Sequence, residues 1–340
     1  MKNVVRVNMV SESDISIKGH GVHTAYIETV RALQALPDVS VVTNEFHRLV
    51  DCDVIHLHTI GLLAWRKLLQ RGPKKVVSAH VVPDSFVGSL VGAKYWRFLA
   101  VWYLRIFYNR ADVVLAVSDE AKRDLVAIGV RRPIEVLHNF IDCEQYREAR
   151  IGRSVVRERL MIPADAFVVV GAGQVQPRKR IDWFIEAAKK LPDVHFVWVG
   201  GMPFGKAAAE STAMQRMMDG APENVHFPGV VSLSDMSSYY HAADVFCLPS
   251  DQETFGLVVV EAAAAGLPVI LRDIPDYAET FASDAVMIHE GELATTVTRL
   301  RSDKKLYERE VARARRIADR FDSRTAVKRL VAIYRQLIVK

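Results

Sequence analysis

The chain has 340 residues, of which half are hydrophobic and a quarter are charged. This balance excludes a disordered chain, and the length predicts two domains of roughly 150 residues each. The net charge of +5, without a long run of Lys or Arg, argues against nucleic acid as a partner. Three widely spaced cysteines, Cys52, Cys143 and Cys247, offer no disulfide framework and favour a cytoplasmic location.

Short runs rich in Val and Ile alternate with segments of helical spacing in the first half of the chain. The expected strands are Val4–Val10, Val39–Thr43, Asp53–His58, Lys75–His80, Asp112–Val117 and Ile134–His138, with helices over Thr24–Leu36 and Asp119–Ala127. This alternation of strand and helix predicts a doubly wound parallel sheet.

The same alternation restarts in the second half. The expected strands are Phe167–Gly171, His195–Val199, Val225–Phe227, Val245–Leu248 and Pro268–Leu271, with helices over Asp182–Lys190 and Leu233–Ala242. We therefore expect two Rossmann-like domains, over residues 1–142 and 143–320. A last amphipathic helix, over 321–340, is expected to return to the first domain.

Loops that follow the strands are the places to look for ligands, because helix N-termini there can hold anions. In the first half, the loop KGHG contains Gly19 and Gly21 and could let the backbone approach a phosphate or a sugar; a plain loop explains it equally well. His80 ends a strand and is a candidate for hydrogen bonding to a substrate hydroxyl or for stabilising developing charge. His56 is more typical of a core histidine.

Asp51 and Asp53 form an Asp-x-Asp pair, a pattern found in some metal sites of sugar transferases. The pair precedes its strand, at the end of the sheet opposite to the expected ligand site. We interpret it as a solvated entry to the strand and expect no metal site.

The segment GAGQVQPRKR, residues 171–180, follows an apolar strand and precedes an amphipathic helix. Gln174, Arg178 and Lys179 are candidates for binding a diphosphate, since guanidinium and ammonium groups converge there with backbone donors. A solvated basic turn is the alternative, but cations at a helix N-terminus are unfavourable without an anion to offset them. Gly200, in the loop WVGGMPFG, could pass close to a nucleotide.

The segment DQETFGLVVVE, residues 251–261, places acids on both sides of a Phe-Gly step. We expect a helix to begin near Phe255 and Gly256, so that phosphates meet its first amides, including that of Leu257. Glu253 and Glu261 could then accept hydrogen bonds from hydroxyls of a sugar and a ribose. Simple charge complementarity at the helix start is the alternative for Glu253, whereas a buried, unpaired Glu261 would be costly.

The segment 93–110 mixes seven aromatic residues with Lys and Arg. A helix of this composition could lie on an anionic membrane surface. A packed helix whose basic side chains reach solvent at its ends is the alternative.

The segment PSDQETFGLVVVEAAAAGLPV resembles the E-x7-E signature of retaining glycosyltransferases of family 4, which have the GT-B fold. GAGQVQPRKR resembles the diphosphate loop of that family, VLHNFID its interdomain segment and KGHG its N-terminal glycine loop. The resemblance covers nearly the whole chain.

The resemblance implies that two domains face a cleft and that a sugar passes from a nucleoside diphosphate to a hydroxyl with retention of configuration, without a metal or another cofactor. By position, Glu253 would contact the donor sugar, Glu261 the ribose and Lys179 the diphosphate. Phe255 and Gly256 would contribute backbone amides.

By the same resemblance, His80 would lie beside the reaction centre. The chain departs from the family pattern at Gln174, where an Arg is usual and Arg178 could supply the missing charge, and at Arg180 and Phe140, where Gly is usual. These departures affect the phosphate contacts and not the class of enzyme.

More narrowly, GQVQPRK, WVGGMPF and KGHGV resemble bacterial transferases that extend glucosyl-diacylglycerol with a second hexose. This implies UDP-glucose or UDP-galactose as donor, a membrane glycolipid as acceptor, and a peripheral location on the inner face of the cell membrane. A soluble or polysaccharide acceptor is one alternative, and a sugar-nucleotide-binding protein without transferase activity is another.

Overall fold

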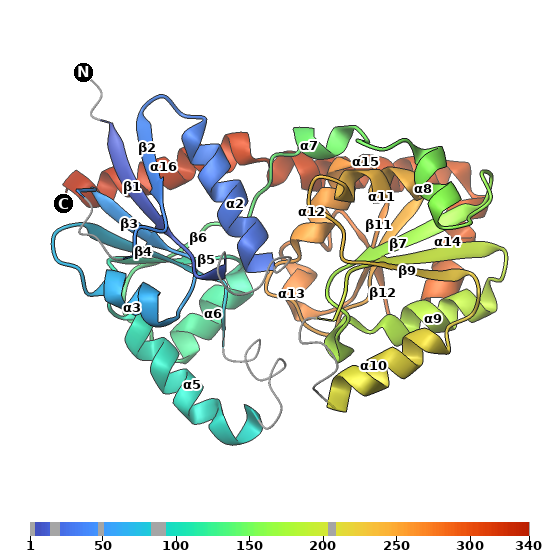
Figure 1. The fold of residues 1–340 in the computed structure, drawn as a ribbon, viewed down its shortest axis with the longest axis horizontal. Helices are drawn as coiled ribbons and strands as arrows, with labels where there is room; N and C mark the ends of the chain where they lie inside the picture. Colours follow the sequence, from blue (N-terminus) through green and yellow to red (C-terminus); the bar gives the residue numbers. More distant parts are fainter. Residues whose placement is uncertain (1–3, 14–20, 47–50, 83–92, 203–208, 340) are drawn as a thin grey trace. The chain divides into compact units, whose positions relative to one another are not determined.

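The computed structural model describes residues 4–13, 21–46, 51–82, 93–202 and 209–339. The chain divides into two compact units, which are drawn together in Figure 1. Unit 1 comprises Met1–Asp142 and Phe321–Lys340, and unit 2 comprises Cys143–Arg320.

Unit 1 contains a six-stranded parallel sheet in the order β2-β1-β3-β4-β5-β6. Its strands are β1 (Val5–Val10), β2 (Val39–Thr43), β3 (Val54–Leu57), β4 (Lys74–Ala79), β5 (Val113–Ala116) and β6 (Ile134–Val136). The central strands β3 and β5 are buried along their whole length, which explains why they are apolar runs without alternation.

Helices cover both faces of this sheet. They are α2 (Gly21–Gln34), α3 (Leu62–Leu68), α5 (Ala93–Tyr108), α6 (Asp119–Ala127) and α16 (Ser323–Val339). In Figure 1, α2 and α16 lie over one face and α3, α5 and α6 over the other. Ser118 caps α6 by accepting a hydrogen bond from the amide of Ala121, and Asp119 and Glu120 match the positive end of that helix.

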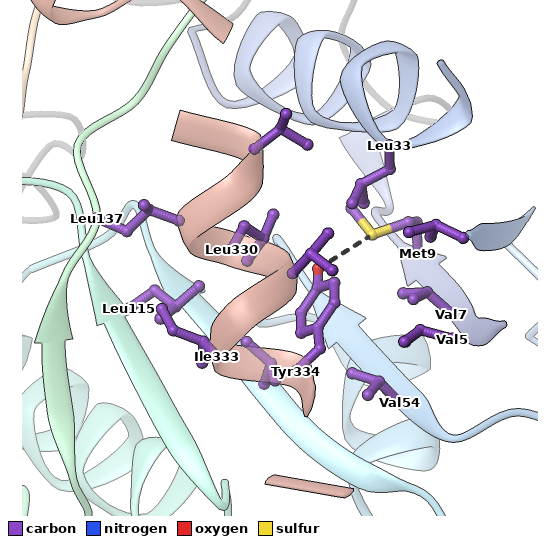
Figure 2. Close-up of a cluster of buried hydrophobic side chains, with 14 of the residues drawn as sticks. Val5, Val7, Met9, Leu33, Val54, Leu115, Leu137, Leu330, Ile333 and Tyr334 are labelled. Carbon is purple, nitrogen blue, oxygen red and sulfur yellow. Dashed lines mark hydrogen bonds between the residues drawn. The ribbon is translucent and has the colours of Figure 1, made fainter. Parts of the chain in front are cut away.

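The core of unit 1 lies between its sheet and the pair α2 and α16. Figure 2 shows Leu330, Ile333 and Tyr334 of α16 pointing toward apolar side chains of the strands. The hydroxyl of Tyr334 also lies 4.0 Å from the sulfur of Met9. The helix α16 is therefore part of the core of unit 1.

Unit 2 contains a second six-stranded parallel sheet, in the order β12-β11-β10-β7-β8-β9. Its strands are β7 (Phe167–Ala172), β8 (Val194–Val199), β9 (Val225–Gly229), β10 (Val245–Leu248), β11 (Val269–Arg272) and β12 (Val286–Ile288). Its helices are α7 (Glu144–Arg147), α8 (Arg153–Arg159), the 3-10 turn η1 (Pro177–Lys179), α9 (Ile181–Lys190), α10 (Ala209–Asp219), α11 (Met236–Ala242), α12 (Leu257–Ala264), α13 (Pro275–Ala278), α14 (Leu293–Ser302) and α15 (Lys304–Arg320).

Arg157 is a buried cation that connects several segments of unit 2. The guanidinium of Arg157 is 2 % exposed. It donates to the carbonyl oxygens of Ala164, Ala166 and Ala242 and to the carboxylate of Asp244. This set of acceptors offsets the loss of water around the charge.

The strands predicted from the sequence are confirmed, with ends that differ by at most two residues. Strand β12 is missing from the prediction, because Val286 and Met287 are only half-buried and the strand is three residues long. Within the described part of the chain, no helix is long and apolar enough to cross a membrane.

Candidate functional site

The strand order of unit 2 reverses between β7 and β10. Loops that follow the two strands on either side of such a switch point diverge and leave a crevice at the carboxyl edge of the sheet. The loops here are residues 173–180, after β7, and residues 249–256, after β10. The fold therefore brings together the two segments that the sequence singled out separately.

Ion pairs and hydrogen bonds connect these two loops. Lys179 forms an ion pair with Glu253, and Arg178 donates to the carbonyl oxygen of Gln252 at 3.0 Å. Arg180 contacts Asp251 at 3.3 Å, and the amide of Asp251 donates to the carbonyl oxygen of Arg178 at 2.7 Å. The chain's own carboxylates thus offset the basic residues at the start of α9, which the sequence alone left without an anion.

The pair of Lys179 and Glu253 is the buried centre of this contact, and both side chains are 8 % exposed. Burial would raise the pKa of Glu253, but the charges of Lys179 and then Arg178 outweigh it and lower the pKa. Burial lowers the pKa of Lys179, against the opposing effect of Glu253. A ligand that takes the ammonium must therefore also offer hydrogen bonds to the carboxylate.

Arg180 occupies the left-handed region, with φ of 50°. Its guanidinium lies over the ring of Trp183, 5.0 Å from the centroid, and the guanidinium of Arg272 lies 4.5 Å from the same centroid. Both cations pair with Asp251. Side chains in this region of backbone space cost about 1–3 kcal/mol, and these contacts offset that cost.

A chain of side-chain hydrogen bonds orients Gln174. Nε of Arg178 donates to Oε1 of Gln176, and Nε2 of Gln176 donates to Oε1 of Gln174, each at 3.0 Å. Because its oxygen is engaged, Gln174 can offer its NH2 group to a ligand. Arg178 is thereby linked to the position where the family pattern has an arginine.

Helix α12 begins at Leu257, and Gly256 is its N-cap with φ of 88°. The predicted helix start is therefore confirmed to within two residues. No side chain caps this end, so its first amides point toward the crevice without a protein side chain to accept from them. Phe255 is 2 % exposed and packs on Phe281, which fixes the turn before the helix.

Glu261 is 3 % exposed on α12. The hydroxyl of Tyr240 donates to its Oε2 at 2.7 Å. The cost expected for an unpaired buried carboxylate is therefore avoided, because α11 supplies a partner. The sequence missed Tyr240, since the two residues lie on different helices.

Gly200 has φ of 146°, and a Cβ atom at this position would lie 1.9 Å from the carbonyl oxygen of Gly173. The glycine is required because the loops after β7 and β8 pack backbone to backbone. Its direct role as a ligand contact remains a prediction.

Sequence reasoning also missed Asp276, whose carboxylate accepts the backbone amide of Glu253 at 2.8 Å. Asp276 belongs to the short helix α13, which follows β11. The signal available was its position after a strand, the same criterion that selected the other loops.

In unit 1 a cluster of histidines lies at the carboxyl ends of β3 and β4. Nδ1 of His58 lies 3.0 Å from Nε2 of His80, and their rings are stacked. His56 contacts the hydroxyls of Tyr334 and Ser78 at 2.6 and 2.8 Å, so its interpretation as a core histidine is confirmed. Burial, then His80, lowers the pKa of His56 to about 3, and burial also holds the pKa of His58 well below its usual value.

The two N-terminal glycines are placed differently by the structure. Gly21 is the first residue of α2, is exposed, and has open space where a Cβ would lie. Gly19 lies outside the described residues.

Asp51 and Asp53, at the opposite end of the sheet, both pair with Arg6. Among the described residues, no group of three His, Cys, Asp or Glu side chains could hold a metal ion.

Comparison with known proteins gives matches to both halves of the chain. Residues 11–145 match the model of Glycosyltransferase Family 4, and residues 165–303 match that of Glycosyl transferases group 1. The chain is 36 % identical over 282 residues to the alpha-galactosylglucosyldiacylglycerol synthase of Streptococcus pneumoniae, an alignment that covers 81 % of this chain and 74 % of the relative. The chain belongs to glycosyltransferase family 4.

A second relative of this family 4 transferase is the processive diacylglycerol alpha-glucosyltransferase of Acholeplasma laidlawii, with 27 % identity and 80 % of each chain covered. The structure of Anabaena Alr3699/HepE in complex with UDP-glucose superposes with a TM-score of 0.77 at 21 % identity, covering 97 % of this chain and 99 % of that one. The family 4 transferase therefore has the GT-B fold and is a retaining hexosyltransferase.

Proposed function

We propose that this family 4 transferase moves a hexose from UDP-glucose or UDP-galactose to a hydroxyl of a membrane glycolipid such as glucosyl-diacylglycerol. The observation that supports this most is the 36 % identity, over 81 % of the chain, with an alpha-galactosylglucosyldiacylglycerol synthase. The joined loops at the switch point of unit 2 supply a matching donor site.

In this proposal unit 2 binds the nucleotide sugar. Lys179 and Arg178 hold the diphosphate together with the first amides of α12, and Gln174 adds its NH2 group. Glu253 accepts hydrogen bonds from hydroxyls of the hexose, and Glu261, held by Tyr240, accepts from the ribose.

The reaction proceeds on one face of the sugar. The bond between the anomeric carbon and the phosphate oxygen breaks as the acceptor oxygen bonds to that carbon, and the departing phosphate takes the acceptor's proton. Lys179 and Arg178 stabilise the charge that develops on the phosphate, and the paired loops hold the groups in register. These two cations would neutralise the diphosphate charge, as a divalent ion does in other transferases. We therefore expect turnover without added metal.

Unit 1 contributes the acceptor side and His80. The ring of His80 is 7 % exposed and is stacked on His58, whose pKa lies well below its usual value. Next to a neutral partner, His80 is held as a hydrogen-bond donor or acceptor in one orientation. We expect it to stabilise charge at the reacting sugar and to orient the acceptor hydroxyl.

A membrane surface is proposed on α5 and the adjoining α3. Phe98 and Trp102 are 69 and 62 % exposed, and Leu62 on α3 is 85 % exposed. Arg105 on α5 and Arg110 in the turn that follows this helix are exposed. Exposed aromatic and basic side chains on one amphipathic helix favour peripheral binding to an anionic membrane, where the lipid acceptor lies.

A donor and acceptor screen tests the proposed reaction. The protein is incubated with UDP-glucose, UDP-galactose or GDP-mannose and with glucosyl-diacylglycerol in mixed micelles, and products are read by mass spectrometry. We expect one added hexose from a UDP sugar, with an alpha linkage. Transfer to a soluble glucoside at the same rate would refute a lipid acceptor, and donor hydrolysis without any transfer would refute the transferase.

Vesicle sedimentation tests the membrane surface. We expect binding to vesicles that contain an anionic phospholipid, and a loss of binding in the double variant Phe98→Ser and Trp102→Ser. The control is Met161→Ser, which removes another exposed apolar side chain, 87 % exposed, from unit 2. Equal binding of the double variant and the control would contradict the proposed surface.

A further inference from the structure

Tyr277, on the short helix α13, has a hydroxyl that the donor site described above does not use. The side chain is fully buried, and its oxygen has no hydrogen-bond partner among the described residues. A buried polar group without a partner costs about 1–3 kcal/mol, so a folded protein retains one where something else satisfies it.

The hydroxyls of three other tyrosines that are buried or half-buried have partners within the fold. In unit 2, the hydroxyl of Tyr240 donates to Glu261 at 2.7 Å, and that of Tyr307 donates to the carbonyl oxygen of Asp244 at 2.9 Å. In unit 1, the hydroxyl of Tyr108 donates to the carbonyl oxygen of Val81 at 2.7 Å. Tyr277 therefore differs from tyrosines whose hydroxyl serves the fold.

The hydroxyl of Tyr277 faces the start of α12. A Cβ atom at Gly256, the N-cap of that helix, would lie 3.6 Å from this oxygen. Gly256 has no side chain beside this oxygen, and α12 begins at the next residue. A phosphate oxygen bound at the first amides of that helix would be an acceptor for the phenol.

The surroundings keep this group protonated. Burial, and then the negative charges of Glu253 and Asp276, hold the pKa of Tyr277 well above its usual value. Its ring is fixed by an edge contact with Phe281, at 5.7 Å between centroids. The phenol is therefore available as a hydrogen-bond donor in a fixed orientation.

We propose that Tyr277 donates a hydrogen bond to a diphosphate oxygen of the nucleotide sugar bound at the start of α12. This assignment rests on the proposed function, and it makes Tyr277 a specificity-determining residue for diphosphate donors. The neighbouring Asp276 holds the amide of Glu253, so α13 would serve the sugar and the diphosphate at once.

Tyr277→Phe tests this inference, because it removes one oxygen and keeps the packed ring. Binding is measured by calorimetry with UDP and with uridine, and stability is measured by thermal unfolding. We expect the Kd for UDP to rise about tenfold, as for one lost hydrogen bond to a charged group. The Kd for uridine should be unchanged, and the melting temperature should stay level or rise.

Tyr307→Phe is the matched control, since it removes a hydroxyl that does have a partner, Asp244. It should lower the melting temperature and leave the Kd for UDP unchanged. A fall in melting temperature for Tyr277→Phe as large as that of the control would assign its hydroxyl to the fold and overturn the inference.

The outcomes separate this inference from the proposed function. Equal affinities of the unaltered protein and of Tyr277→Phe for UDP would overturn the role of Tyr277 alone. Absence of UDP binding by the unaltered protein would overturn both the donor class and this role. An equal loss of affinity for UDP and for uridine would also overturn the contact with the diphosphate.

Discussion

The two units have the same layers and a sheet of the same size, yet the carboxyl edges of their sheets are built from different chemistry. In unit 2 the edge is made of opposite charges, with Lys179 against Glu253 and Arg180 against Asp251. In unit 1 the corresponding edge is made of buried histidines that stay neutral, His56 and His58.

In the proposed function, this difference fits two kinds of ligand. A diphosphate carries fixed negative charge and needs cations and amides, whereas an acceptor hydroxyl is neutral and needs oriented donors and acceptors. One layer architecture can hold either kind of edge because these residues, apart from His56 within β3, lie in loops or just after the strands.

The largest expected effect is on the acid stability of unit 1. A buried histidine with a lowered pKa binds its proton more readily in the unfolded chain. The free energy of unfolding should therefore fall as the pH drops from 6.5 toward 3, by up to about 1.4 kcal/mol per pH unit for each such histidine. Hydrogen exchange of unit 1 peptides between pH 7 and 4.5 measures this.

The variant His58→Phe keeps an aromatic ring in the stack and cannot titrate. We expect it to flatten the pH dependence of unit 1 peptides, while peptides around Lys179 and Glu253 in unit 2 behave as before. An unchanged slope in this variant would mean that the histidine cluster does not account for the difference between the units.

The next largest effect is expected for Glu253→Gln in unit 2. Without its charge, the side chain binds hexose hydroxyls less well and no longer neutralises Lys179, so the initial rate of transfer should fall by about 10²–10³. The control is Glu310→Gln, which removes another buried carboxylate of unit 2, 2 % exposed and paired with Arg313. Transfer by Glu253→Gln at the rate of that control would refute the assigned role.

Lys179→Met should act mainly on donor binding. The loss of one cation at the diphosphate is expected to raise the KM for the UDP sugar by about ten- to a hundredfold, with a smaller change in kcat. Lys67→Met removes a buried lysine of unit 1, 2 % exposed, and should leave the KM as it is. A KM unaffected by Lys179→Met would place the diphosphate elsewhere.

A smaller effect is expected for Tyr240→Phe, because Glu261 keeps its charge and loses one hydrogen bond of 2.7 Å. The KM for the donor should rise about three- to tenfold, in keeping with one hydrogen bond to a charged group. Tyr239→Phe, at the preceding residue of α11, should have no such effect. Equal values for the two variants would show that Tyr240 does not orient Glu261.

The smallest effect is expected for Arg180→Gly. Glycine relieves the left-handed backbone while Asp251 loses one of two cations, so stability should change by less than about 1 kcal/mol and transfer should fall about two- to fivefold. Met161→Gly is the matched control, since Met161 also has a positive φ, of 55°. It should gain stability and keep full transfer, and a loss of transfer there would show that backbone relief is itself harmful.

Much of the fold could be predicted from the sequence because buried parallel strands are apolar along their length. Val245–Leu248, which is buried along its length, was predicted with its observed bounds. The edge strand Val39–Thr43 was also predicted with its bounds, because it is rich in Val although only one of its five residues is buried. The edge strand β12 lacked that signal because only one of its three residues is buried. A run of three residues is too short to give the pattern that predicted β2, even though both strands lie at the edge of a sheet.

The donor site was predicted in its residue types and not in its partners. Lys179 and Glu253 were selected from the loops in which they lie, but their pairing joins residues 74 positions apart. Tyr240, Asp276 and Tyr277 were missed because their helices look ordinary until the fold brings them to Glu261, Glu253 and Gly256. Contacts across the sheet depend on strand order, which no local pattern contains.

The placement of α16 in unit 1 has a consequence for the order in which the protein folds. During synthesis residues 143–320 leave the ribosome before residues 323–339, so unit 2 has all its elements while the face of the first sheet near Val7 and Met9 still lacks Leu330 and Tyr334. Unit 2 can therefore finish first, and the unit that begins the chain completes its core last. A separately expressed first unit would have to be a fusion of residues 1–142 with residues 321–340.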